Sequence, residues 1–378
     1  MADSNYVRET FTDIDYALLG YNILKGYPLE DGMDPGFAGP IFAADYAGLG
    51  MSADCRYNIP DGLYVYPEIS CQTSFSSQEI KSQKELETSL SASVSGSAGG
   101  WGAMFSASAS YEQESSKVST GEALLIMSQA TCRYYKTRLD TETPPALHDN
   151  FIDKVNSIVS AATADQEAAV HDFLDAYGTH FLTDIDFGAR YTKQHEMSYS
   201  QYEIASSHSY DVSVQASYAG VYDVSGSASL SADQQAAAED FNSRVTTTTI
   251  TIGATPPASG DELEWASEVK ESPMPIKFTL SSIEDLFTSQ YMSAVPQYED
   301  AKTALLAHQA TYCADLSTRL GVENNCDVVY SGEYQQFSKS QISCVVYVQG
   351  PQTAAHHQKV FLLVDFALKL HVMSCVFR

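Results

Sequence analysis

The sequence predicts an α+β fold, because strand-like stretches and amphipathic helices alternate along most of the chain. Strands dense in β-branched and aromatic residues are expected at 123–135, 179–197 and 244–252. Helices with one apolar face are expected at 148–160, 165–176 and 297–320. The 378 residues are enough for one large domain or two ordinary ones.

The remaining elements follow from local composition. Residues 1–50 are rich in Tyr, Gly and Pro, which predicts an extended arm or small strands packed on a core. Residues 61–76 alternate like a strand, and the polar residues 77–88 are compatible with a helix. Residues 321–378 contain short alternating apolar runs, so we expect a separate small β-rich C-terminal region, incomplete or involved in targeting, after a main domain at 1–320.

Two helix starts carry capping signals. Asp165 precedes an apolar-periodic run and is an N-cap candidate. Ser281 and Glu284 have the spacing of a capping box before Leu286 and Phe287. Both sites therefore predict a side chain that accepts a hydrogen bond from a free backbone N–H.

Charge excludes several classes of partner. The formal net charge is -27, which argues against nucleic acid and against electrostatic capture by anionic lipid. The most apolar stretch, Val360 to Phe377, carries Asp365, Lys369 and His371, which argues against a spanning helix. The first residues lack the pattern of a secretory signal, which leaves a missing leader, unconventional export or a cytosolic protein open.

Neither an enzyme nor a cofactor-binding site is expected. The chain lacks the motifs G-x-S-x-G, H-E-x-x-H and the phosphate-binding loop, and its seven cysteines show no metal-ligand spacing. No cofactor, metal site or catalytic residue is therefore predicted. The scattered cysteines fit two or three disulfides with one odd thiol, and the alternative is reduced, buried thiols in a cytosolic protein.

One Ser/Ala/Gly block, at 211–230, alternates with a period of two. Every even position from 212 to 230 is apolar, tyrosine or glycine, while most odd positions are polar. Ala219 and Val221 interrupt the alternation at its centre. Such a run is a strong β signal. The apolar face contains Val212, Val214, Ala216, Tyr218, Tyr222, Val224 and Ala228.

A second block, at 89–111, alternates in the same way but changes phase at Gly99-Gly100, which predicts a hairpin turn. Its arms are close to the roughly 9–11 residues that a tilted strand needs to cross a bilayer. The alternative readings are outer strands of a soluble sheet, or flexible linkers. Residues expected to meet lipid, with Trp101 at the tip, are Leu90, Ala92, Val94, Trp101, Phe105 and Ala107.

Small side chains make a single hairpin a weak membrane anchor. Each buried CH₂ contributes only about 0.8 kcal/mol, and each unpaired backbone group in lipid costs several kcal/mol. Insertion becomes favourable when many copies pair every strand edge in a closed barrel. The composition therefore predicts that self-association precedes insertion.

The most specific motif lies at the corner between the expected helix at 165–176 and the expected strand at 179–197. Tyr177-Gly178-Thr179-His180-Phe181 is followed after six residues by Gly188-Ala189. This motif resembles the signature of the membrane-attack-complex/perforin family, which usually ends in Gly-Gly, so Ala189 departs from it. The resemblance extends over residues 10–315. His180, beside Thr179, is expected to be structural rather than catalytic.

The resemblance implies the architecture and the function. We expect a bent, twisted, mainly antiparallel four-stranded sheet flanked by two helical clusters, the first segment (77–120) and the second segment (200–243). Members of that family insert both as β-hairpins, so the implied function is pore formation in defence or venom. The alternative is a non-lytic structural, adhesion or developmental protein.

The resemblance also implies the partners and the location. The protein would be secreted as a soluble monomer and would convert to a membrane-inserted ring. Its partners would be a lipid membrane and further copies of itself. A targeting subunit or receptor is left open as a third partner.

Overall fold

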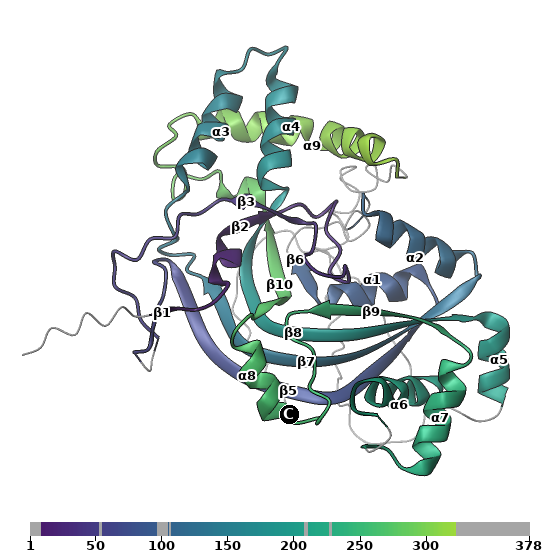
Figure 1. Ribbon diagram of the computed structural model, residues 1–378. Coiled ribbons are helices and arrows are strands. Elements are labelled where there is room, and N and C mark those ends of the chain that lie inside the picture. Colours follow the sequence, from purple (N-terminus) through teal and green to yellow (C-terminus); the bar gives the residue numbers. More distant parts are fainter. Residues whose placement is uncertain are drawn as a thin grey trace, which may run out of the picture. The chain divides into compact units, whose positions relative to one another are not determined.

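The computed structural model describes residues 9–52, 55–96, 105, 107–207, 211–226 and 229–322. An α+β architecture is confirmed, with a mainly antiparallel sheet at its centre (Figure 1). Three long strands lie side by side, and the fourth position is shared by two shorter ones. These strands are β5 (Leu63–Ile80), β7 (Ala123–Leu139), β8 (His180–Ser198), β9 (Thr246–Ile252) and β10 (Met274–Ser282).

The β8 strand organises the sheet. It pairs with β7 along most of its length, while on its other side β10 pairs with the first half and β9 with the second. The change from β10 to β9 falls between Gly188, which pairs with Met274, and Arg190, which pairs with Ile252. A bulge in β7 between Arg133 and Tyr135 lies at the same level. The sheet therefore changes partners and register at Gly188-Ala189, the end of the signature motif.

Shorter strands widen the sheet beyond the four expected positions. In the described residues, β2 (Leu19–Tyr21) pairs with β3 (Phe37–Pro40) and with β8, and β6 (Val94–Gly96) runs parallel to β10. A separate parallel pair joins β1 (Glu9–Thr10) to β4 (Tyr57–Asn58). Residues 9–50 thus contain small strands packed on the core, one of the two predicted arrangements.

In the described residues, both segments contain helices. The first segment holds α1 (Gln83–Ser91) and α2 (Ala109–Ser119), and the second holds α5 (Tyr199–Ser207), α6 (Val212–Ser225) and α7 (Ala232–Asn242). The alternation at 212–230 is therefore not a strand here. Asp211 caps α6 by accepting hydrogen bonds from two backbone N–H groups, and alanines supply a small buried helix face.

The two helical clusters contact opposite faces of β7. Leu125 and Met127 join the core cluster that includes Leu86 and Tyr111 of the first segment. Leu124 and Ile126 pack in a second cluster with Val212, Ala216 and Phe241 of the second segment. Successive residues of a strand point to opposite faces. Each helical segment therefore covers its own side of the same strand.

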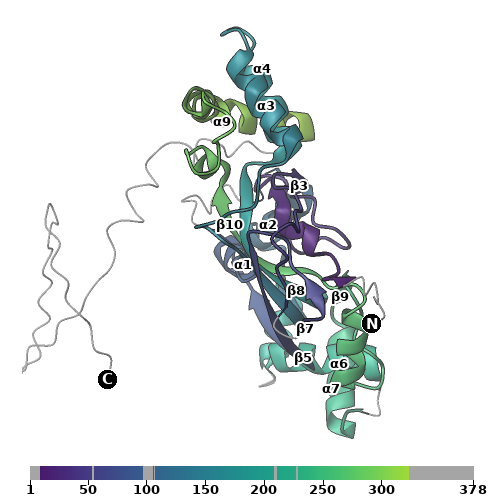
Figure 2. The same cartoon turned by 90° about the vertical axis from the view of Figure 1, so that its left-hand side faces the viewer.

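Three helices pack together at the end of the sheet remote from α6 and α7 (Figure 2). They are α3 (Asp149–Ser160), α4 (Gln166–Tyr177) and α9 (Tyr298–Leu320), all as predicted. A fourth helix, α8 (Glu262–Val269), contacts β5 and β7. One-turn 3₁₀ helices are η1 (Ile14–Leu18) and η4 (Ile283–Leu286).

One capping prediction was confirmed in position and the other was wrong. Asp165 is the N-cap residue of α4, although its side chain makes no capping hydrogen bond. Ser281 belongs to β10, where it pairs with Phe181. The short η4 helix begins after Ser282 without a side-chain cap. Sheet pairing thus took precedence over the local capping pattern. The predicted region 321–378 lies outside the described residues beyond Val322.

Candidate membrane-inserting site

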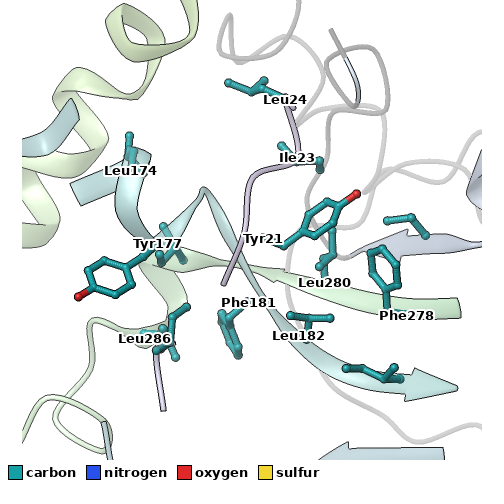
Figure 3. Close-up of a cluster of buried hydrophobic side chains, with 14 of the residues drawn as sticks. Tyr21, Ile23, Leu24, Leu174, Tyr177, Phe181, Leu182, Phe278, Leu280 and Leu286 are labelled. Atoms are coloured by element: carbon teal, nitrogen blue, oxygen red, sulfur yellow. The ribbon is translucent and has the colours of Figure 1, made fainter. Parts of the chain in front are cut away.

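The corner between α4 and β8 is built around Gly178, whose φ of 78° favours glycine. A Cβ at this position would lie 2.4 Å from the backbone carbon of Tyr21. Thr179 donates its N–H to the Tyr21 carbonyl at 3.0 Å, and its hydroxyl accepts the N–H of Ile23 at 3.0 Å. These hydrogen bonds therefore fasten the N-terminal chain to the start of β8. Figure 3 shows Tyr21 of that chain in the same cluster as Tyr177 and Phe181.

The aromatic and basic residues of the same motif are buried. Tyr177 packs edge-on against Phe151, and Phe181 joins the core cluster. His180 shares a hydrogen bond of 2.9 Å between its Nδ1 and the hydroxyl of Thr179. Burial lowers the pKa of His180 to about 4, partly opposed by Glu284. A neutral, buried imidazole with this partner fits a structural role.

The bend of β8 has little space for side chains. A Cβ on Gly188 would lie 2.0 Å from the Cys132 carbonyl oxygen, and one on Gly253 would lie 2.9 Å from the Gly188 carbonyl oxygen. Ala189 is fully buried in a cluster with Cys132 and Trp265 of α8. The indole of Trp265 donates to the Ala254 carbonyl at 3.0 Å. The residue that replaces the second glycine is therefore a packing point beneath α8.

A disulfide joins Cys71 of β5 to Cys132 of β7, which are directly paired in the ladder. Cys313 is also disulfide-bonded, and Cys55 is free and exposed. At least part of the predicted disulfide framework is thus present. The pairing itself was not predictable, because cysteine spacing does not specify connectivity.

The first segment buries most of its predicted lipid-facing residues. Leu90, Val94, Phe105 and Ala107 are buried in the main core, and Ala92 is exposed. Trp101 lies outside the described residues. In this state the segment therefore keeps its apolar side chains away from solvent.

The second segment divides its predicted lipid-facing residues between two environments. Val212 and Ala216 are buried against the sheet, whereas Val214 is 42% exposed. Three further members of the set are half-buried, namely Tyr218, Tyr222 and Val224. Ala228 lies outside the described residues. The helical period separates side chains that a strand would place on one face.

Polar contacts that sequence reasoning missed hold the second segment on the sheet. Lys193 of β8 forms an ion pair of 3.2 Å with Asp223 of α6. Ser217 hydrogen-bonds Ser77 of β5 at 2.7 Å. The buried ring of His195 packs edge-on against Phe241 of α7 at 4.9 Å between centroids. Isolated polar residues inside strands gave no sequence signal for these roles.

Ion pairs join β7 to β8 in the half of the sheet where β8 also pairs with β10. Lys136 and Arg138 of β7 face Asp184 and Asp186 of β8, with Lys136 Nζ 3.4 Å and Arg138 Nε 2.9 Å from the same Asp184 oxygen. These aspartates therefore pair with basic residues of the neighbouring strand. Asp211 is the cap of α6.

The described residues contain no group of three or more His, Cys, Asp or Glu side chains suited to a metal ion. Among the helices in the described part of the chain, none combines the length and apolarity needed to cross a membrane.

A bent antiparallel sheet whose two long connections are helical clusters defines the class of perforin-like proteins. The model of the MAC/Perforin domain matches residues 12–316, and the chain belongs to that family. The expected family and fold class are thereby confirmed.

Similar proteins occur in apple snails and in a bacterium. The perivitellin-2 67 kDa subunits of Pomacea canaliculata and Pomacea maculata are 27% identical over 282 residues and 26% identical over 280. Each match covers 72% of this chain and 48% of the relative, so the chain spans about half the length of these relatives. The crystal structure of GNIP1Aa from Chromobacterium piscinae matches with a TM-score of 0.57 at 15% identity, covering 83% of this chain and 57% of that one.

Proposed function

We propose that this protein forms pores: copies assemble on a membrane, and each converts its first and second segments into two amphipathic β-hairpins of a shared barrel. Family membership supports a role of this general kind. The proposed activity is physical rather than catalytic, and it needs no cofactor. The observation that carries the proposal is the register of the sheet at the points where both segments begin.

Four residues form one row across the sheet where the chain enters and leaves the two segments. Ile80 of β5 faces Leu125 of β7, Leu125 faces Glu196 of β8, and Glu196 faces Thr246 of β9. Residues in one row point to the same face of a sheet. The register can therefore be continued, one residue at a time, along all four arms of the two proposed hairpins.

In the continued register, the apolar positions of the two segments coincide. Within the first hairpin Val94 would face Tyr111, and within the second Val212 would face Leu230 and Tyr218 would face Val224. Every second row then collects the apolar side chains of all four arms on one face. The two alternations are far apart in sequence, so their agreement in phase supports a single lipid-facing surface.

The same continuation locates the two turns. It centres the second turn on Val221, where the alternation is interrupted. It centres the first turn between residues 102 and 103, three residues beyond the predicted Gly99-Gly100 turn. Both tips would therefore lie at a similar depth, which a common barrel requires.

Assembly supplies the missing strand pairing. Among the described strands, β5 pairs only with β7 and β9 pairs only with β8, so each has one free edge. We propose that β5 of one copy pairs with β9 of the next, which closes a ring and removes every edge from lipid. The Ser-rich faces would line the lumen. Before assembly the protein would be secreted and soluble.

A targeting partner is also proposed. The relatives in apple snails are named as subunits and are about twice as long as the matched region. With a net charge of -27, this chain is poorly suited to capture by anionic lipid on its own. A receptor or second subunit would then bring the domain to its membrane.

The test is dye release from liposomes, with electron microscopy of the same samples. Neutral, anionic and sterol-containing vesicles would be compared. Release together with rings of uniform diameter supports pore formation. If no vesicle type shows dye release or rings, pore formation by the chain alone is contradicted.

Ala189 favours a second candidate function, a non-lytic structural, adhesion or developmental protein. Its methyl group fills the bend where the family usually has glycine, and it packs beneath α8. A bend held in this way would resist the straightening that insertion needs. Membrane binding without dye release would support this second candidate.

A further inference from the structure

The N-terminal arm, residues 19–37, lies between the signature corner and the first segment. We propose that the arm is a clasp that holds the first segment in its helical form and must detach before that segment can extend. This inference rests on the proposed pore-forming function. Backbone contacts are the first evidence, because Phe105 donates its N–H to the Ile23 carbonyl at 2.8 Å and Ala107 donates to Leu24 at 2.9 Å.

Side chains reinforce this backbone pairing. The ring of Tyr27 meets the buried ring of Phe105 edge-on, with centroids 6.3 Å apart, and its hydroxyl donates a hydrogen bond to Glu114 of α2. The hydroxyl of Ser110 donates to Glu30 at 2.9 Å. All the first-segment residues in these contacts lie at or after Phe105. The arm therefore grips the return half of the proposed hairpin.

Arg190 joins the arm to the other half. Its guanidinium donates hydrogen bonds to the Pro28 carbonyl of the arm and to the hydroxyl of Ser93 in the first segment. A third hydrogen bond of 3.2 Å reaches the Ile276 carbonyl of β10. The residue is only 4% exposed, and a buried charge is tolerated only with such partners. Loss of either the arm or the segment would leave Arg190 short of partners, so the two are held together.

The opposite side of the arm is anchored at the signature. Ile23 donates its N–H to the Thr179 hydroxyl, and Asp34 accepts hydrogen bonds from the Tyr21 hydroxyl at 2.9 Å and the Tyr27 N–H at 2.9 Å. Figure 3 shows Tyr21, Ile23 and Leu24 on this part of the arm, close to β8. Movement of β8 at the corner would thus be transmitted through the arm to the first segment.

A covalent bridge tests the clasp directly. Glu30→Cys and Ser110→Cys would be combined in a Cys55→Ser background, because Cys55 is exposed and free. Both new thiols would replace half-buried side chains that already touch. One sample would be linked by a short bismaleimide, and the matched control would carry N-ethylmaleimide on both thiols. We expect the linked protein to release dye at least tenfold more slowly than the capped control.

A second variant tests the contact between the arm and the first segment in solution, without a membrane. Tyr27→Phe keeps the ring against Phe105 but removes the hydroxyl that contacts Glu114. Loss of a hydrogen bond to a charged group corresponds to about a tenfold change in an opening equilibrium. We therefore expect hydrogen exchange at the amides of Phe105 and Ala107 to accelerate about tenfold. The control is Tyr64→Phe, which removes an exposed hydroxyl that bonds Asp140.

The outcomes separate the clasp from the proposed function. Equal dye release from linked and capped protein would overturn the clasp. If neither sample releases dye, pore formation by this chain fails, and hydrogen exchange alone decides the clasp. Unchanged exchange in Tyr27→Phe would then overturn it, whereas faster exchange would support an arm that restrains the first segment.

Discussion

At the residue scale, His195 couples the second segment to pH. Its ring is buried between β8 and α7, where Nδ1 shares a hydrogen bond of 2.8 Å with the Thr247 hydroxyl. Burial, and secondarily Lys193, lowers the pKa of His195 to about 4. The imidazole is therefore neutral in the folded protein at pH values where a solvated histidine near 6.5 already binds a proton.

Acidification should consequently loosen the second segment. The stability contributed by neutral His195 is complete above pH 6.5 and is lost as the pH falls towards 4, in total on the order of 3 kcal/mol. We expect His195→Gln to flatten the pH dependence of the urea midpoint between pH 7 and 4. His308→Gln, in α9, is the control and should leave that dependence unchanged. Parallel pH curves for His195→Gln and the parent protein would contradict this role.

Ala189 gives a second prediction at this scale. Ala189→Gly removes a buried methyl from the bend, which should lower the free energy of unfolding by roughly 1–2 kcal/mol. If bend opening limits insertion, dye release should accelerate several-fold. Ala130→Gly is the matched control, because Ala130 is buried in the same cluster but lies on β7, where it pairs with Tyr191. Equal release rates for both variants would exclude a special role for the bend residue.

At the element scale, residues 212–225 would expose different side chains as the helix α6 and as part of the proposed β-hairpin. Val214 is exposed in the helix, so Val214→Asp should change the free energy of unfolding by less than about 0.5 kcal/mol. In the proposed hairpin the same side chain meets lipid, where a charge is destabilising in every copy. We expect dye release to fall at least tenfold while vesicle binding persists.

The matched control lies on the other face of the same proposed hairpin. Ser225→Asp adds the same charge at a half-buried helix position, four residues from Val221, whereas Val214 is seven residues from it. On the lumen side it should leave dye release near the parental rate. Full lysis by Val214→Asp would refute the assigned lipid face.

Elements with strong local patterns were predictable, and elements fixed by distant contacts were not. The apolar spacing of α3, α4 and α9 and the β-branched run of β9 located those elements closely. Ser281 failed as a cap because pairing with Phe181 keeps it in β10. The alternation of the second segment indicated a strand, but residues 212–225 form the helix α6, because the strand period alone does not show which side chains the sheet buries. Arg190 and His195 were missed because their partners lie in distant parts of the chain.

At the scale of the whole molecule, net charge should govern assembly. Copies with a formal charge of -27 repel one another, and the Debye length falls from roughly 30 Å at 0.01 M salt to about 8 Å at 0.15 M. Ring assembly on neutral vesicles should therefore accelerate several-fold over this range. Light scattering or dye-release kinetics would measure it, with an uncharged osmolyte as the control. A rate that falls with added salt would instead indicate attraction between unlike charges at the interface.

The bridge between Cys71 and Cys132 has a consequence for the accuracy of refolding. A slip of one residue between two strands transfers every side chain to the opposite face. In the proposed first hairpin, such a slip would turn Leu90 and Val94 from the lipid-facing side to the water-facing side. The disulfide ties β5 to β7 at one matched pair, so the strands that lead into this hairpin cannot slide past each other. The disulfide thus fixes the register of β5 against β7, and this register would decide which side chains face lipid in the proposed hairpin.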